Sequence, residues 1–352
     1  MTAVVLAMLA CGRTEPLRYQ SDYDPTQTDS GVDAGPPDAG HVACIPGLVS
    51  LMPAIPKVMF VLDRSDSMSS MFGNTTRWGA LSGALDEVLP PVDQKMELGA
   101  LIFPSDSFAA CSVASSPAID PALGNATPLL NLIHLTRPAG HTPTAVALNV
   151  AGGSILSDRA ATGARALVLA TDGAPNCNAS LDPRTCNCGG VGCGVGADCL
   201  DDVRTIQSIR GLAQQNLPTY VIGIQDMPGV LTDVLNQMAL AGGRPKAGSQ
   251  SYYAVTSQAE LTDALTTIRN QVGACVFLTT SVPDALGSLT LTVNGTPVPY
   301  DATSTDGWSW TNRDNGELEV FGPPCARLVS LGNAMVQATI QCATADAGAD
   351  GG

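Results

Sequence analysis

Apolar runs and polar breaks alternate along residues 57–272, and the alternation predicts strands separated by helices. The segments 58–62 and 166–170 are short and continuously apolar, as expected for strands buried on both faces of a parallel sheet. Between them, apolar residues such as Trp78, Leu81 and Leu85 recur at helical spacing. Further strands are expected at 97–103, 219–224 and 252–255, and helices at 77–92, 144–156, 201–216, 230–241 and 260–272. Strands separated by helices imply right-handed crossovers, so we predict an α/β fold with a doubly wound, mostly parallel sheet and helices on both faces.

The pattern changes after Cys275, where strand-like segments follow one another without helices between them. Asn294-Gly295 lies between two of these segments and is a strong hairpin signal. Trp308 and Trp310 would share one face of a strand, where we expect core packing rather than a binding patch. The expected strands are 276–278, 289–293, 317–321 and 336–340. We therefore predict a main domain over residues 44–274 and a small C-terminal antiparallel β module over residues 275–342.

Oxygen-bearing side chains follow the first apolar run at every second position, as Asp63, Ser65 and Ser67. Hard divalent cations take oxygen ligands, and open α/β sheets bind ligands beyond the carboxyl ends of their strands. The same residues also occur in ordinary turns, because Asp and Ser side chains bond to their own backbone. The segment is therefore a candidate site for Mg²⁺, or for Mn²⁺ or Ca²⁺, that needs support from other parts of the chain.

That support comes from a resemblance. The segment 63–67 resembles the first part of the metal-ion-dependent adhesion site of von Willebrand factor type A domains, the fold shared with integrin inserted domains. The family pattern continues with a Thr on a later loop and an Asp after a later strand, and the segments 141–145 and 167–173 supply both. The resemblance covers roughly residues 56–272. It implies that an ion is held, directly or through water, by Asp63, Ser65, Ser67, Thr142 and Asp172. Asp66 departs from the family, which usually has Gly there, and adds a carboxylate near the metal loop.

The overall charge and the scarcity of histidine exclude other classes of protein. A formal net charge of −15 argues against a nucleic-acid partner, which requires a basic face. Only three histidines are present, so a catalytic triad has little to draw on. The chain also lacks a Walker or dinucleotide-binding glycine motif. We therefore expect a protein that is not an enzyme.

The N-terminus resembles a bacterial lipoprotein signal over residues 1–11, with Cys11 as the lipidated residue. Its apolar part is too short to span a bilayer, and a diacylated Cys11 would anchor the chain rather than cross the membrane. Because a basic n-region is missing, a degenerate secretory signal or a plain apolar N-terminus is the alternative. Residues 12–43 and 343–352 are rich in small and polar residues and are expected to form a disordered linker and tail. We expect an exported protein that is lipid-anchored in the cell envelope, at the outer membrane or cell surface.

Ten cysteines remain after Cys11, an even number that suits five disulfides in an exported protein. Five of them lie in the insert 177–199, where zinc is the alternative, but the spacings do not form paired C-x₂-C motifs. In a doubly wound sheet the insert and Cys111 belong to the metal-bearing rim, and the other four cysteines belong to the opposite rim. Because a disulfide needs Cα atoms within about 7 Å, we expect Cys111 to pair with an insert cysteine and the other insert cysteines to pair among themselves. The remaining two bonds should join Cys44, Cys275, Cys325 and Cys342, with Cys44 bonded to Cys275 or to a module cysteine.

These features together predict a surface-anchored protein-binding or adhesion module that depends on a divalent metal. The resemblance implies that a carboxylate of the protein partner completes the coordination, since few protein charges on the ion leave it electrophilic. The alternative is an envelope scaffold in which the metal site is structural and binding uses the β module or the Cys-rich loop. An accessory role in a hydrolase or a metal-insertion complex is disfavoured by the cysteines and the apparent lipoprotein signal.

Overall fold

The computed structural model describes residues 43–105, 111–158, 164–178, 180–182, 184–188, 194–224, 230–284, 288–331 and 334–343. Cys11, the predicted signal, residues 12–42 of the predicted linker and residues 344–352 of the predicted tail lie outside the described residues. The chain divides into a unit of residues 1–39 and a unit of residues 40–352, and all described residues belong to the second. Within these ranges, no helix has the length and apolarity needed to cross a membrane.

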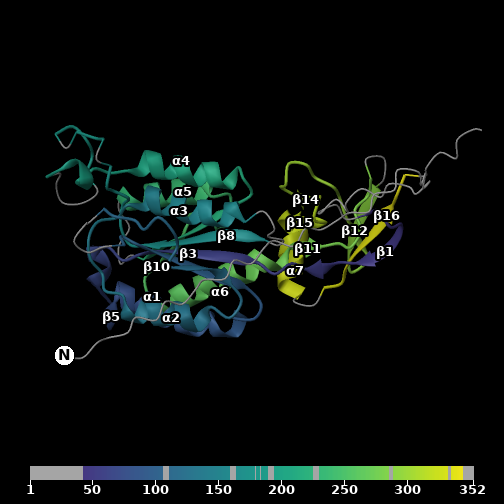
Figure 1. The fold of residues 1–352 in the computed structure, drawn as a ribbon, viewed down its shortest axis with the longest axis horizontal. Coiled ribbons are helices and arrows are strands. Elements are labelled where there is room, and N and C mark those ends of the chain that lie inside the picture. Colours follow the sequence, from purple (N-terminus) through teal and green to yellow (C-terminus); the bar gives the residue numbers. More distant parts are fainter. Residues whose placement is uncertain are drawn as a thin grey trace, which may run out of the picture. The chain divides into compact units, whose positions relative to one another are not determined.

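The main domain is built on a sheet in which the described residues form six strands, in the order β10-β9-β8-β3-β6-β7 (Figure 1). All neighbouring strands are parallel except β7, which runs antiparallel at one edge. The mostly parallel sheet predicted from the sequence is thus confirmed. The strands are β3 (Lys57–Asp63), β6 (Glu97–Phe103), β7 (Ile119–Ala122), β8 (Arg165–Thr171), β9 (Thr219–Ile224) and β10 (Tyr253–Val255).

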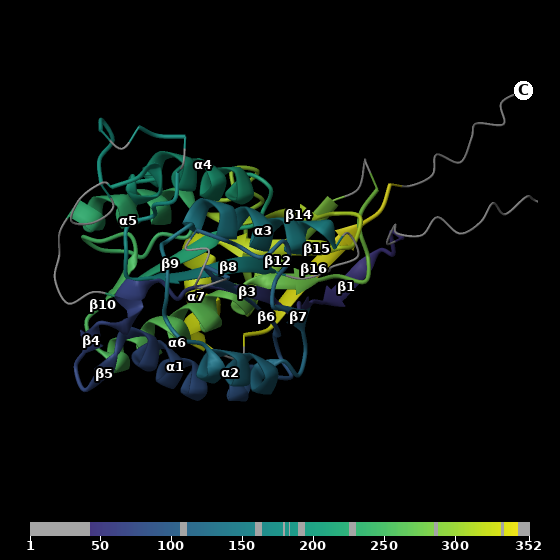
Figure 2. The same cartoon turned by 60° about the vertical axis from the view of Figure 1, so that its left-hand side comes forward.

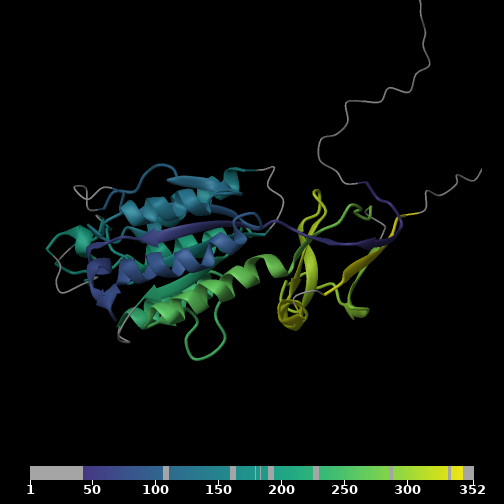
Figure 3. The ribbon, with the colours of Figure 1, turned by 90° about the horizontal axis from the view of Figure 1, so that it is seen from below.

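Helices cover both faces of this sheet. One face carries α1 (Arg77–Val88), α2 (Ala126–Leu135) and α6 (Gln258–Ala274), and Figure 3 brings α1 and α6 to the front, side by side. The other face carries α3 (Thr144–Ser157), α4 (Asp202–Ala213) and α5 (Val230–Ala241) (Figure 1). Side chains of β3 alternate between the two cores, with Phe60 and Leu62 in one and Val61 in the other. This double burial explains why the strand is continuously apolar.

Helix α1 ends earlier than its hydrophobic pattern suggested. The pattern predicted a helix to residue 92, but α1 stops at Val88, and a short 3₁₀ turn, η2 (Pro90–Val92), follows. Two consecutive prolines explain the change, because proline lacks the backbone N–H that a helix interior requires. At the other end, Thr76 caps the helix, its Oγ1 accepting a hydrogen bond from the Gly79 N–H at 3.0 Å.

Between β3 and α1 the chain forms three small elements at the end of the sheet. They are the 3₁₀ turn η1 (Asp66–Ser69) and a hairpin of β4 (Met71–Phe72) and β5 (Thr75–Thr76). The Arg77 N–H donates to the Ser70 carbonyl at 3.0 Å, which ties the first residue of α1 to the loop that follows β3.

The described residues of the C-terminal module form two antiparallel sheets around one core, and the antiparallel character is the one predicted from the sequence. One sheet contains β1 (Gly47–Ser50), β16 (Val336–Gln341), β12 (Ser288–Val293) and β13 (Thr296–Val298). The other contains β14 (Gly307–Asn312), β15 (Glu317–Phe321), β11 (Val276–Leu278) and β2 (Met52–Pro53). Asn294 and Gly295 both have positive φ, 48° and 78°, so the predicted hairpin turn joins β12 to β13. Trp308 is buried in this core, with its ring centroid 5.5 Å from that of Trp310.

Two short strands add to the module from a part of the chain that was expected in the main domain. β1 pairs with β16 (Figure 2), and β2 pairs with β11, although both β1 and β2 precede β3 in the sequence. Residues 47–53 therefore lie in the sheets of the module. A helix that the pattern did not indicate, α7 (Gly322–Leu331), also packs against it.

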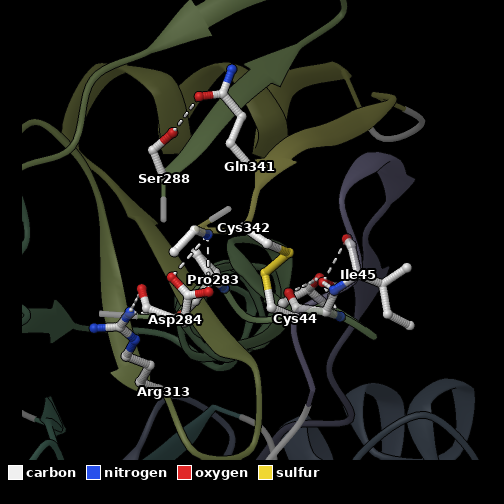
Figure 4. Close-up of a disulfide and its surroundings, with 11 residues drawn as sticks. Cys44, Ile45, Pro283, Asp284, Ser288, Arg313, Gln341 and Cys342 are labelled. Atoms are coloured by element: carbon white, nitrogen blue, oxygen red, sulfur yellow. Dashed lines mark hydrogen bonds between the residues drawn. A yellow bond between two sulfur atoms is a disulfide. The ribbon is translucent and has the colours of Figure 1, made fainter. Parts of the chain in front are cut away.

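The disulfides follow the predicted division between the two rims. Cys111 pairs with Cys177 of the insert, and Cys186 pairs with Cys199. Cys188 is disulfide-bonded as well. At the module, the bonds are Cys44–Cys342, seen in Figure 4, and Cys275–Cys325. The described insert cysteines are therefore in disulfides, and the part of the chain that the structure describes holds no cluster of three or more His, Cys, Asp or Glu residues suited to zinc.

Candidate metal centre

Strands β3 and β8 lie side by side at the centre of the sheet and end at the same edge. Their register pairs Leu62 with Ala170, so Asp63 and Thr171 come next to each other. The Thr171 hydroxyl donates to Asp63 Oδ2 at 2.6 Å, and the Ser65 N–H donates to Asp63 Oδ1 at 2.8 Å. Asp63 is completely buried, although its side chain is ionisable. These two hydrogen bonds fix the orientation of its carboxylate.

The two serines of the predicted site connect the ends of β3 and β8. The Ser65 and Ser67 hydroxyl oxygens lie 3.1 Å apart, and the Ser67 hydroxyl donates to Asp172 Oδ1 at 2.7 Å. Asp172 follows β8 directly and is buried, with 5% of its surface exposed. Asp63, Ser65, Ser67 and Asp172 thus form one continuous group of oxygen-bearing side chains.

Thr142 reaches the same group from the loop before α3. Its N–H donates to the Asn176 side-chain oxygen at 2.7 Å, and the Asn176 N–H donates to the Thr142 carbonyl at 3.0 Å. A methyl group placed on Gly173 would lie 3.6 Å from both the Ser67 and the Thr142 hydroxyl oxygens. The structure therefore brings all five sequence-predicted residues to one edge of the sheet, with Asn176 holding the Thr142 loop in place.

Burial makes both carboxyl groups of the site costly to ionise. Burial raises the pKa of Asp63, and the charge of Asp172 raises it further, to about 7. Burial also raises the pKa of Asp172, and hydrogen bonds from Arg77 and Ser67 oppose that increase. A cation placed between the two groups would relieve this unfavourable arrangement.

Arg77 is a member of this site that the sequence analysis did not identify. Its Nη1 donates to Asp172 Oδ2 at 2.7 Å, in an ion pair whose side chains are 18% and 0% exposed. Arg77 is the first residue of α1, where a positive charge opposes the helix dipole. The first turn of α1 has no acidic residue that could offset this charge. The sequence could therefore have indicated that Arg77 pairs with a carboxylate from another part of the chain.

Two neighbouring residues lie at the margin of the site. Asp66, the departure from the family pattern, is exposed, and its N–H donates to the Gly140 carbonyl at 3.0 Å. In the described part of the chain, Asp66, Asp63 and Asp172 do not form a group of three acidic residues close enough to hold one ion together. His141 Nδ1 lies 3.7 Å from Asp198 Oδ1, so the Thr142 loop also contacts the Cys-rich insert.

The donor set fits a hard divalent cation. It consists of two carboxylates and three hydroxyls, all oxygen, at the carboxyl ends of adjacent parallel strands where the chain order of the sheet reverses. Nitrogen and sulfur ligands, which would favour zinc or copper, do not belong to the group. Only two of the donors are charged. The donor set therefore suits Mg²⁺ or Mn²⁺ that keeps some of its water ligands, rather than an ion enclosed completely by protein atoms.

Comparisons with known proteins bear on the fold. Residues 58–174, a third of the 352-residue chain, match the family model described as von Willebrand factor type A domain. None of the curated proteins matches the chain. Among solved structures it is similar to the SpaC pilus adhesin of Lactobacillus rhamnosus GG in its open conformation, at 17% identity and a TM-score of 0.47. That match covers 86% of this chain and 42% of the adhesin, so the chain spans less than half of the SpaC length.

Two further solved structures show similar levels of likeness. The von Willebrand domain of the type V pili tip protein Mfa5 from Porphyromonas gingivalis is 14% identical, with a TM-score of 0.45 and coverage of 62% of this chain and 94% of that chain. The manganese-loaded TRAP protein of Plasmodium vivax is 18% identical, with a TM-score of 0.44 and coverage of 63% and 76%. The match to the family model, together with the strand order and the helices on both faces of the sheet, shows a von Willebrand factor type A-like fold.

Proposed function

We propose that this protein is a protein-binding module of the adhesion type that depends on a divalent cation, with Mg²⁺ as the first choice and Mn²⁺ or Ca²⁺ as alternatives. The observation that carries the proposal is the convergence of two buried carboxylates and three hydroxyls beyond the ends of β3 and β8. The residues that would hold the ion are Asp63, Ser65, Ser67, Thr142 and Asp172.

Each of these residues has a separate task in the proposed site. Asp63 and Asp172 supply the negative charge, and the hydrogen bonds from Thr171 and from the Ser65 N–H keep the Asp63 carboxylate oriented. Ser65 and Ser67 supply neutral oxygens, which add ligands without adding charge. Bound there, the ion supplies an electrophilic position for a carboxylate of the partner.

The charge balance supports an acidic group on the partner. Two carboxylates balance a divalent ion, and Arg77 adds a further positive charge beside Asp172. The loaded site therefore keeps a net positive charge in a chain whose overall charge is strongly negative. An acidic side chain of a partner protein is the complementary ligand.

The disulfides support an exported protein, because such bonds persist mainly in oxidising compartments. The proposal places the protein at the bacterial cell surface or outer membrane, held by a lipid on Cys11 and by no other membrane contact.

Isothermal titration of Mg²⁺ and of Mn²⁺ into the full chain tests the site. Binding should be measurable in the wild type and absent in Asp63→Ala and Asp172→Ala, while circular dichroism shows that both variants remain folded. Asp66→Ala is the matched control: its carboxylate lies in the same loop but is exposed, so this variant should bind with nearly unchanged affinity. Undiminished binding in both site variants contradicts the assignment.

Partner capture in Mg²⁺ and in EDTA then tests the function. Loss of the captured protein on chelation, and in Asp63→Ala, supports metal-dependent adhesion. Capture that is insensitive to EDTA and to Asp63→Ala favours the envelope scaffold, in which the metal site is structural.

A further inference from the structure

Asp172 forms an ion pair with Arg77, a residue that is not one of the proposed metal ligands. We propose that Arg77 is an internal competitor of the divalent cation: it neutralises Asp172 in the metal-free protein and weakens cation binding at the same site. The inference rests on the metal centre of the proposed function and concerns how the affinity of that centre is set.

The contacts of Asp172 support the proposed competition. Its Oδ1 accepts from Ser67 and its Oδ2 accepts from Arg77, both at 2.7 Å, so both carboxylate oxygens have protein partners. A cation that draws on this carboxylate, directly or through a water, shares it with a guanidinium that is already in place. The Asp172 side chain is fully buried, so solvent screens this interaction only weakly.

The position of Arg77 is also fixed. Its N–H donates to the Ser70 carbonyl within the metal loop, and the Thr76 cap holds the turn in which it lies. The next residue, Trp78, is buried, and its Nε1 donates to the Ile133 carbonyl at 3.2 Å. The base of the Arg77 side chain therefore cannot move away from the site without disturbing the start of α1.

Two opposite effects follow from this arrangement. Without a metal, Arg77 stabilises the fold, because it is the positive charge in contact with a buried carboxylate, and removing one partner of such a pair leaves an uncompensated charge. A cation bound at Asp172 would be repelled by the same charge, because Arg77 contacts that carboxylate and its side chain is largely buried. A single substitution at Arg77 should therefore lower metal-free stability and raise metal affinity together.

Arg77→Gln is the decisive variant, since it removes the charge and keeps a side chain that donates hydrogen bonds. We expect Mg²⁺ and Mn²⁺ to bind about tenfold more tightly by isothermal titration, given the strength of a unit charge at this range. In EDTA the variant should have a lower melting temperature than the wild type, and saturating Mg²⁺ should raise that temperature by more than it does in the wild type.

Arg64→Gln is the matched control. Arg64 follows Asp63 directly, and its guanidinium donates hydrogen bonds to the carbonyl oxygens of Pro104 and Arg137. The control removes the same charge from a residue next to Asp63 whose guanidinium is held by backbone carbonyls, and its cation affinity should change less than about threefold. If Arg77→Gln does not fold, Arg77→Met, which keeps the apolar stem, serves the same test.

Unchanged or weaker cation binding in the folded Arg77→Gln variant overturns the inference, and so does equal tightening in Arg64→Gln. The proposed function fails in a different way, because then neither the wild type nor Arg77→Gln binds Mg²⁺ or Mn²⁺ at millimolar concentration. Tight binding seen only in Arg77→Gln supports both the metal centre and the competition.

Discussion

Raising the pH should destabilise the metal-free protein through Asp63. Burial and the neighbouring charge of Asp172 raise the pKa of Asp63 from 3.8 to about 7, so between these values the folded state holds a proton that the unfolded state releases. The bound proton therefore stabilises the protein fully when the pH is below the pKa of Asp63 in the unfolded state. This stabilisation is lost as the pH rises through the pKa of Asp63 in the folded state. Between pH 5 and pH 8, linkage gives a loss of roughly 2 to 3 kcal/mol in the free energy of unfolding.

The assay compares wild type and Asp63→Asn in EDTA by chemical denaturation at these two pH values. An asparagine at this position cannot ionise, so the variant should lack this part of the pH dependence. Other buried carboxyls, on Asp201 and Glu319, also have raised pKa values and act in the same direction. For that reason the difference between the two proteins, rather than the wild-type slope, measures the contribution of Asp63.

Saturating Mg²⁺ provides an independent check. The ion requires an ionised Asp63, so it should stabilise the wild type more at pH 8 than at pH 5. Equal pH dependence of wild type and Asp63→Asn in EDTA would refute the reasoning about the buried pair.

Three further predictions concern the helix cap, the module disulfide and the anchor. Thr76→Ala removes the side-chain cap of α1 and should cost about 1 kcal/mol in chemical denaturation; an unchanged midpoint argues against the cap. Replacing Cys44 and Cys342 by Ser opens a loop of 298 residues and should cost on the order of 5 kcal/mol by the chain-entropy account, which an unshifted thermal transition would contradict. Cys11→Ser should move the protein in its native host from the detergent phase to the aqueous or precursor fraction. An intact mass with an unmodified, uncleaved Met1 in the wild type would rule out the lipid anchor.

Continuous apolarity made the central strands predictable. Strand β3 is buried on both faces, so its sequence is apolar without interruption, and the polar break that follows marks the edge where ligands bind. The order of Asp63, Thr142 and Asp172 relative to expected strands and helices placed all three on one rim. The division of the cysteines between the two rims followed from the same topology, whereas the topology left open which cysteines pair within each rim.

Elements with mixed or short patterns were not predictable. Strand β7 contains Pro121, which reads against a strand but is tolerated at the edge of a sheet. Strands β1 and β2 have four and two residues, with Leu48 and Met52 exposed, so their place depends on pairing with strands that come much later in the chain.

The Arg77–Asp172 pair joins residues 95 positions apart, and no local rule specifies such a contact. It arises because η1 and the β4–β5 hairpin turn the chain back, so that the start of α1 faces the end of β8. The sequence thus indicated the ligands of the proposed ion but did not indicate the charge beside them.

The Cys44–Cys342 bond determines how the module responds to mechanical load. Strand β1 is an edge strand, and its ladder with β16 begins at Gly47 and Ile340, only a few residues from the two cysteines. Tension that arrives from the N-terminal side would otherwise open this ladder one hydrogen bond at a time, starting at that end. The disulfide drawn in Figure 4 joins the two chains outside the first pair of the ladder, so the pulling force enters β1 and β16 together. A protein held by its N-terminus while its partner is pulled would therefore keep β1 in place until a covalent bond is reduced.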